Sequence, residues 1–209
     1  MVLSPRKPTL VLDLDGTILD RNFWESLRLY LVPSARTGRI FSQAAPVLRR
    51  LGGKARLVGV TARCLLAAGN TRRWLRAQGV PDIPVLHAPF FLVTERARVR
   101  FKRRALRRLK DEGHRLVLGV GDRGSDLEAY VREGLFPVLL VPSPGGRRHR
   151  SLLERAARLG LEEGGDYVLF QGARGEESLW ERVGAWIEEA LEKGALPGAG
   201  RDLTPPPRR

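Results

Sequence analysis

Short apolar runs alternate along this chain with segments of helical periodicity, and this alternation constrains the fold more than any other feature. The apolar runs occupy 10–14, 56–60, 85–86, 116–120, 138–141 and 167–170. The helical patterns occupy 23–30, 46–51, 65–78, 96–111, 125–133, 151–159 and 176–192. Strands that alternate with helices form parallel sheets with crossover helices on the two faces. The sequence therefore predicts an α/β protein with a three-layer, doubly wound parallel sheet.

The length and the ends of the chain suggest how this fold is bounded. A chain of 209 residues suits one domain with a hydrophobic core. We expect a single domain over 1–193, in which 21–52 form a small cap or cover segment. Residues 194–209, "GALPGAGRDLTPPPRR", are rich in Gly and Pro and predict a flexible tail.

The expected location is the cytoplasm. Cys64 is the only cysteine, so the sequence offers no disulfide framework. The N-terminus lacks a secretory pattern, and no run approaches the roughly 18 apolar residues that a membrane span needs.

The strongly basic composition favours anionic partners. The net charge is +14 and the calculated pI is about 11.2. Phosphorylated metabolites, nucleic acid and an acidic membrane surface would all be attracted by such a charge. Two runs are especially basic, "TERARVRFKRRALRRLK" and "GGRRHR". A bias towards Arg in composition would give the same excess without any ligand, and the two runs would then be a solvated helix face and a loop.

Acidic and hydroxyl side chains follow the predicted strands where the strands end. Asp13 and Asp15 lie at the end of the first strand, Thr61 follows the second, and Asp122 and Asp126 follow the fourth. Ligands of doubly wound sheets bind outside the carboxyl ends of the strands, so we expect these side chains to converge. Two carboxylates about 4 Å apart repel by about 4 kcal/mol at an effective dielectric of 20, so a cation must accompany them. An all-oxygen set of ligands suits Mg²⁺, and the three His are scattered without ligand spacing.

A lysine supplies a second candidate charge. On a helical wheel of 96–111, the apolar stripe contains Val99, Ala105, Leu106 and Leu109, and Lys102 falls inside it. A lysine in a buried stripe either extends its ammonium group to the surface or reaches an internal anion. We expect Lys102 to reach the anionic site, with Arg98 as a second candidate.

Together these residues resemble a known family. "DLDGT" at 13–17, Thr61, Lys102 and "GDRGSD" at 121–126 are similar to the four ordered motifs of the haloacid dehalogenase-like hydrolases, over about 10–141. The resemblance implies a Rossmann-like core with little or no cap domain, because the intervals available for insertions are short. It also implies an aspartyl-phosphate intermediate on the first Asp of the motif.

The resemblance assigns a role to each candidate residue. Asp13 would be the nucleophile, and Asp15 would protonate the leaving oxygen and then activate water. The residues implied in phosphate binding are Gly16, Thr17, Thr61, Ala62 and Lys102. The residues implied in Mg²⁺ binding are Asp13, Asp15 through its carbonyl, Asp122 and Asp126. The implied catalytic set is Asp13, Asp15, Thr61 and Lys102.

These roles predict an Mg²⁺-dependent phosphatase that hydrolyses a phosphomonoester, whose partner is a phosphorylated substrate. The acid at position 15 argues against dehalogenases and phosphonate hydrolases, which resemble this pattern without that acid. Two alternatives stay open: a phosphatase or binding protein acting on nucleic-acid ends, and a phosphomutase. A purely structural interpretation takes residues 15–17 as a turn and Ser125 as a helix cap. It leaves unexplained the occurrence of Asp13, Thr61, Lys102 and Asp122 at one edge of the sheet.

Overall fold

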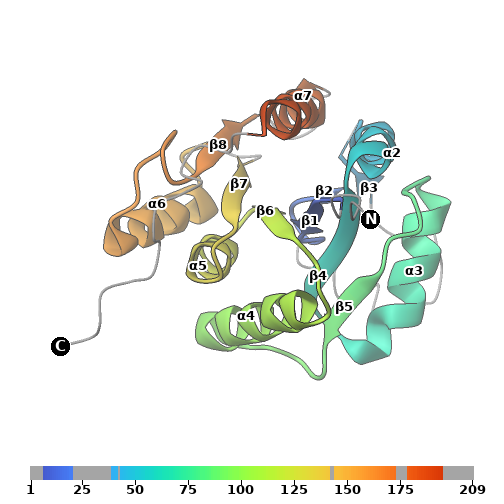
Figure 1. Ribbon diagram of the computed structural model, residues 1–209. Helices are drawn as coiled ribbons and strands as arrows, with labels where there is room; N and C mark the ends of the chain where they lie inside the picture. Colours follow the sequence, from blue (N-terminus) through green and yellow to red (C-terminus); the bar gives the residue numbers. More distant parts are fainter. Residues whose placement is uncertain (1–6, 21–38, 42, 142–143, 173–177, 195–209) are drawn as a thin grey trace.

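The computed structural model describes residues 7–20, 39–41, 43–141, 144–172 and 178–194 (Figure 1). The predicted helix at 23–30 and all but the first residue of the predicted tail at 194–209 lie outside the described residues.

Six parallel strands form the main sheet, which confirms the predicted doubly wound α/β architecture. The strands are β1 (Thr9–Leu12), β4 (Arg56–Cys64), β5 (Val85–Ala88), β6 (Leu116–Gly121), β7 (Phe136–Val141) and β8 (Val168–Gln171). Their order is β5-β4-β1-β6-β7-β8, and each neighbouring pair is parallel. The chain builds the sheet outward from β1 to β5 and then returns to the other side of β1. The topological switch point therefore lies between β1 and β6.

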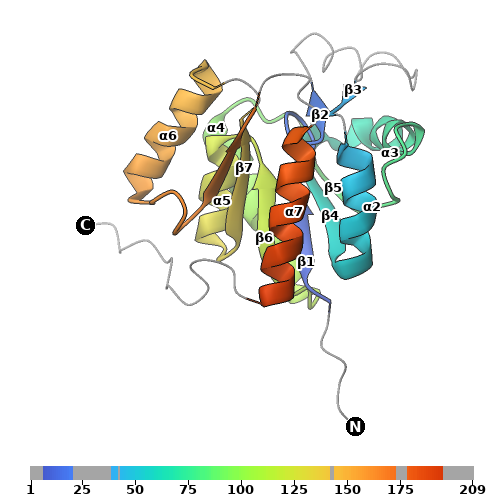
Figure 2. The same ribbon diagram turned by 90° about the horizontal axis from the view of Figure 1, so that it is seen from above.

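Helices cover both faces of this sheet, giving three layers (Figures 1 and 2). One face carries α2 (Ala44–Lys54), α7 (Ser178–Lys193) and α3 (Ala68–Ala77), which follows the short 3₁₀ helix η1 (Leu65–Ala67). The other face carries α4 (Glu95–Asp111), α5 (Gly124–Arg132) and α6 (Arg147–Leu159).

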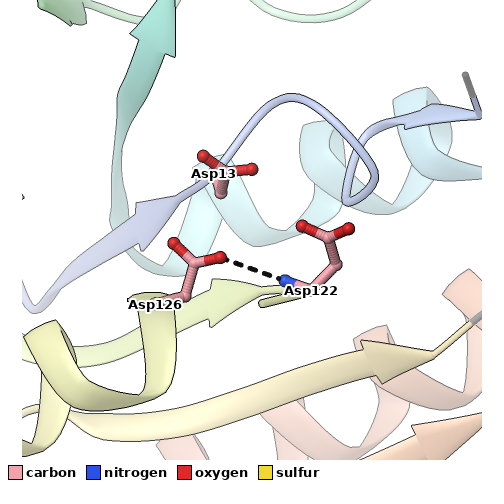
Figure 3. Close-up of side chains that lie close together, drawn as sticks. All are labelled: Asp13, Asp122 and Asp126. Carbon is pink, nitrogen blue, oxygen red and sulfur yellow. Dashed lines mark hydrogen bonds between the residues drawn. The ribbon is translucent and has the colours of Figure 1, made fainter. Parts of the chain in front are cut away.

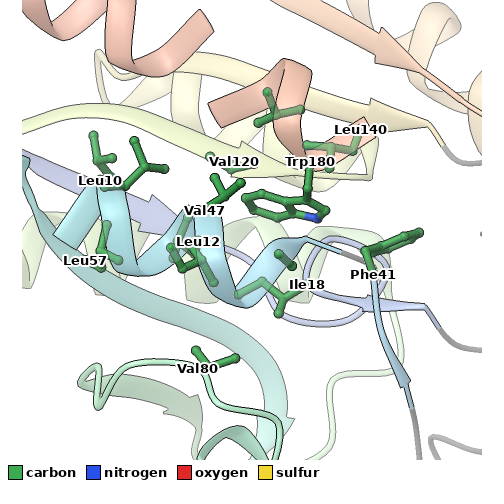
Figure 4. Packing of buried hydrophobic residues seen from close by; sticks show 14 of the residues in the cluster. Leu10, Leu12, Ile18, Phe41, Val47, Leu57, Val80, Val120, Leu140 and Trp180 are labelled. Carbon is green, nitrogen blue, oxygen red and sulfur yellow. The ribbon is translucent and has the colours of Figure 1, made fainter. Parts of the chain in front are cut away.

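Side chains of β1 point alternately to the two faces of the sheet, so this strand contributes to the hydrophobic core on both faces. Leu10 and Leu12 are fully buried against α2 and α7, where Trp180 and Val47 also pack (Figure 4). Val11 points the other way, into the cluster formed with α4 and α5. Because successive side chains of a strand face opposite sides, Asp13 continues the face of Val11, towards α4 and α5.

Two further strands, β2 (Leu19–Asp20) and β3 (Arg39–Ile40), form a separate antiparallel pair. They border part of the predicted cover segment at 21–52, of which 21–38 lie outside the described residues. The later part of that segment, from Ala44, forms α2 and packs into the main core. Within the described ranges, no helix combines the length and the apolar character needed to cross a bilayer.

Candidate active site

The acidic side chains of three separate segments meet at the switch point of the sheet. Asp13 follows β1, Asp122 follows β6, and Asp126 lies in the first turn of α5. One carboxylate oxygen from each lies within 4.8 Å of the other two, and all three residues are buried. Figure 3 shows the three side chains, from two neighbouring strand ends and the start of α5, gathered in one place. The expected convergence of these acids is therefore observed.

Two glycines allow the segments to approach this closely. Gly16 has a φ of 91°, and a Cβ there would lie 2.0 Å from Asp122 Oδ2. Gly121 ends β6, and a Cβ there would lie 2.5 Å from the Cβ of Asp126. A side chain at either position would collide with one of the clustered acids, so the loop after β1 and the start of α5 both depend on glycine.

Lys102 lies between two of the three acids. Its ammonium group donates to Asp13 Oδ1 at 2.7 Å and also to Asp126 Oδ1. The lysine is only 2% exposed, so its position in the apolar stripe of α4 carries it into the site rather than to the surface. The second oxygen of Asp126 accepts from the backbone N–H groups of Asp122, at 3.3 Å, and Arg123, at 3.1 Å. One oxygen of Asp126 therefore binds Lys102, and the other binds the backbone just before α5.

Asp122 has a different set of partners. Arg148, from α6, donates to its Oδ2 at 2.8 Å, and Arg123 Nε lies 3.7 Å from its Oδ1. Oδ1 is buried and accepts no hydrogen bond from the described part of the chain. A buried carboxylate oxygen without a hydrogen bond is costly, and a bound cation would satisfy it. The three carboxylates, including this oxygen of Asp122, therefore fit a hard divalent ion such as Mg²⁺.

Burial and mutual repulsion disturb the ionisation of the acids. Burial raises the pKa of Asp13 to about 7; Lys102 opposes this rise, while Asp126 and Asp122 add to it. Burial likewise raises the pKa of Asp122 to about 6, against the attraction of Arg123 and Arg148. Burial acts to lower the pKa of Lys102, but Asp126 and Asp13 outweigh it and hold that pKa above its ordinary value. The site therefore holds a permanent cation beside carboxylates that need further positive charge to ionise fully.

Asp15 stands apart from the three-acid cluster and is held by an arginine. Arg63 Nε and Nη2 donate to Asp15 Oδ2 and Oδ1 at 2.8 and 2.7 Å, a bidentate pair. The Arg63 side chain is 4% exposed and that of Asp15 is 27% exposed. Arg63 also donates to the Thr71 hydroxyl at 3.2 Å. The carboxylate of Asp15 is therefore held in a fixed position and remains partly exposed to solvent.

The predicted phosphate-binding residues are arranged around the same strand ends. Thr61 lies within β4 and is fully buried, and its hydroxyl accepts from Arg63 N–H at 3.3 Å. Ala62 is partly exposed beside it. Thr17 is fully buried, its hydroxyl has no hydrogen-bond partner among the described residues, and its carbonyl accepts from Trp180 Nε1 at 3.0 Å. The predicted phosphate-binding and metal-binding roles of all these residues remain predictions.

Sequence reasoning missed two arginines of the site, Arg63 and Arg148. β4 continues to Cys64, four residues beyond the predicted end at 60. Arg63 lies where the register of β4 shifts, between Thr61 and Cys64, so the period of a strand did not mark its position. α6 begins at Arg147 rather than at 151, and its first turn carries the Arg148 that contacts Asp122. The run "GGRRHR" has no apolar periodicity, so nothing in the sequence marked this start.

Comparison with solved structures identifies the fold. A predicted phosphatase from Clostridium acetobutylicum matches with a TM-score of 0.56 and 10% identity, covering 88% of this chain and 99% of that chain. A haloacid dehalogenase-like hydrolase from Streptococcus pneumoniae matches with a TM-score of 0.54 and 12% identity, covering 86% and 98%. A phosphoserine phosphatase matches with a TM-score of 0.52 and 12% identity, covering 90% and 98%.

One further structural match covers less than half of the matched chain. A chain of a Pnkp1/Rnl/Hen1 complex matches with a TM-score of 0.47, and this chain spans only 45% of its length. No protein-family model matches the sequence, and no curated protein matches it. The sheet order, the helices on both faces and the structural matches agree: this chain has the fold of the haloacid dehalogenase-like hydrolases.

Proposed function

We propose that this protein is an Mg²⁺-dependent phosphatase that hydrolyses a phosphomonoester through an aspartyl phosphate on Asp13. One observation carries the proposal: a buried carboxylate at the end of β1 is hydrogen-bonded to Lys102 and lies beside two further carboxylates. Three buried carboxylates with one lysine lower the stability of the fold unless more positive charge binds beside them. A divalent cation would supply that charge and would also attract the phosphate group of a substrate. The matching phosphatase folds support the same reaction class.

The first half of the reaction would transfer the phosphoryl group to the protein. An oxygen of Asp13 forms a bond to phosphorus while the ester P–O bond breaks. The leaving oxygen takes a proton from the carboxyl group of Asp15. For Asp15 to carry that proton, one of its two hydrogen bonds from Arg63 must open, because the bidentate pair favours the ionised form. Lys102, already bonded to Asp13 Oδ1, stabilises the negative charge that gathers on the transferred group.

The second half would return Asp13 to its free form. Asp15, now ionised, removes a proton from a water molecule that attacks phosphorus, and the bond from phosphorus to Asp13 breaks to release inorganic phosphate. Asp13, Asp122 and Asp126 would hold Mg²⁺, which supplies positive charge beside the phosphoryl oxygens.

The test is phosphate release from an aryl phosphate in the presence of Mg²⁺. Asp13→Asn should lose activity by about 10³-fold or more, because an amide does not replace the carboxylate nucleophile. Asp111→Asn is the matched control, since Asp111 is an exposed acid at the end of α4 and its change should leave the rate unaltered. Acid-quenched wild-type protein should carry a phosphoryl group on the peptide that contains Asp13.

Two outcomes would overturn the proposal. Activity that survives in Asp13→Asn would show that Asp13 is not the nucleophile. Activity that survives exhaustive chelation would show that the reaction does not require a metal ion. Product analysis separates the phosphomutase alternative, because an isomerised sugar phosphate without net phosphate release would identify a mutase.

A further inference from the structure

A basic groove runs over α5. It has a volume of about 570 Å³, and α4 and α6 form its two walls. Figure 1 shows α5 between these two helices on one side of the sheet. Six arginines line the groove: Arg96, Arg100, Arg103, Arg132, Arg155 and Arg158. Glu128 is the one acid in the same lining, so the groove has a large excess of positive charge.

The charges of the groove are only partly neutralised. Glu128, which is 9% exposed, pairs with Arg132 at 2.9 Å and with Arg155 at 2.5 Å. Arg103 pairs at 2.7 Å with Glu133. The buried carboxylate of Glu128 thus fixes the guanidinium groups of Arg132, on α5, and Arg155, on α6.

The other three arginines of the lining, Arg96, Arg100 and Arg158, are exposed. Within the described residues, none of the three has a carboxylate at ion-pair distance; Arg158 donates only to the carbonyl of Glu154. These three guanidinium groups are therefore available to an anion from outside.

The groove adjoins the candidate active site through α5 and α6. Arg155 packs over Gly124, where an added Cβ would lie 3.2 Å from the Cβ of Arg155. Gly124 is the first residue of α5, two residues after Asp122 and two before Asp126. An extended anion held in the groove would therefore lie next to the helix that contributes to the acidic cluster.

We infer that this groove binds the phosphodiester backbone of a nucleic acid strand. Guanidinium groups bind phosphate in a bidentate manner, and several of them along one groove match a chain of repeated phosphates better than a single anion. A flat lipid surface would reach only the rims of a groove enclosed by two helices. The inference concerns binding alone and does not depend on chemistry at Asp13.

The test measures binding of a fluorescent single-stranded oligonucleotide that lacks terminal phosphates, so phosphatase activity does not affect it. The wild-type protein should bind at low salt, and its affinity should fall as salt rises. The triple variant Arg96→Gln/Arg100→Gln/Arg158→Gln should bind about tenfold or more weakly. The slope of log affinity against log salt should become shallower by about 2, because each neutralised phosphate of a single strand contributes about 0.7 to that slope.

A control triple variant isolates the groove from net charge. Arg49→Gln/Arg56→Gln/Arg73→Gln removes the same charge from exposed positions outside the groove, so its affinity and slope should match the wild type. Equal weakening in both triple variants would overturn the inference, as would no wild-type binding at low salt. Parallel measurements with DNA, RNA and duplex DNA identify which source of phosphodiester binds. Binding to phosphatidylserine vesicles alone would also overturn the inference.

Discussion

The pair formed by Arg63 and Asp15 fixes the carboxylate that the proposed reaction uses as acid and base. Arg63 holds both oxygens of Asp15 and is itself fixed by Thr71 and by burial in β4. A planar guanidinium in this geometry restricts the carboxylate to one plane, which a lysine could not do. In the proposed reaction Arg63 would therefore act through Asp15, as a positioning residue.

A double-mutant cycle tests this positioning. Asp15→Asn should lower kcat by about 10²–10⁴-fold, the usual contribution of a general acid or base. Arg63→Gln should lower it by a smaller factor, and Arg63→Lys should recover only part of the loss. In the Asp15→Asn background, Arg63→Gln should have little further effect, because the group that it positions is already gone.

The control for this cycle is Arg76→Gln, which removes an arginine from a surface ion pair with Asp82. Strictly additive losses from Asp15→Asn and Arg63→Gln would show that Arg63 acts independently of Asp15.

At the scale of elements, α7 holds the loop after β1 in place through a hydrogen bond. Trp180 is fully buried in α7, and its indole N–H donates to the carbonyl of Thr17 at 3.0 Å. This hydrogen bond joins residues that are 163 positions apart. The C-terminal helix thus stabilises the turn between Asp15 and β2.

Trp180→Phe should lower the free energy of unfolding by about 1–3 kcal/mol, because it leaves the buried carbonyl of Thr17 without its donor. Urea denaturation measures this loss. Trp186→Phe, on the same helix, is the control: Trp186 is partly buried and stacks on Phe136 with ring centroids 5.7 Å apart. An equal loss in both variants would show that packing, rather than the hydrogen bond, accounts for the effect.

The sequence predicted the elements well where hydrophobic periodicity was strong. All six strands of the main sheet were predicted, and the convergence of Asp13 and Asp122 followed from parallel topology alone. β2 and β3 were missed because strands of two residues carry no periodic pattern. The pairing of Asp15 with Arg63 could not be predicted, since it depends on how far β4 extends and on the loop that faces it.

For the whole molecule, we expect the clustered acids to make stability depend on pH and, if the proposed Mg²⁺ binds, on the metal as well. The metal-free folded state has pKa values of about 7 for Asp13 and about 6 for Asp122, above the ordinary value of 3.8. Between about pH 4 and 7 the folded state therefore binds more protons than the unfolded state. In that range the free energy of unfolding contributed by these groups falls as pH rises.

The expected outcome is that metal-free protein gains about 1 kcal/mol from Asp13 when pH is lowered from about 8 to about 6. Mg²⁺ should stabilise it at the higher pH, by about 2.7 kcal/mol at 100 times its Kd, and less at the lower pH because protons compete for the carboxylates. Urea denaturation with and without Mg²⁺ measures both effects. In Asp13→Asn the difference between the two pH values should shrink; identical pH dependence in the two proteins would contradict the assignment.

The pairing of β1 with β6 also sets an order of events during synthesis. Lys102 follows Asp13 by 89 residues, and Asp126 lies a further 24 residues beyond Lys102. β1 therefore cannot pair with β6 until the long segment between them has been synthesised, and contacts so distant in sequence form slowly. Lys102 emerges before Asp122 and Asp126, so the nascent chain acquires the cation before it must bury the later carboxylates beside Asp13.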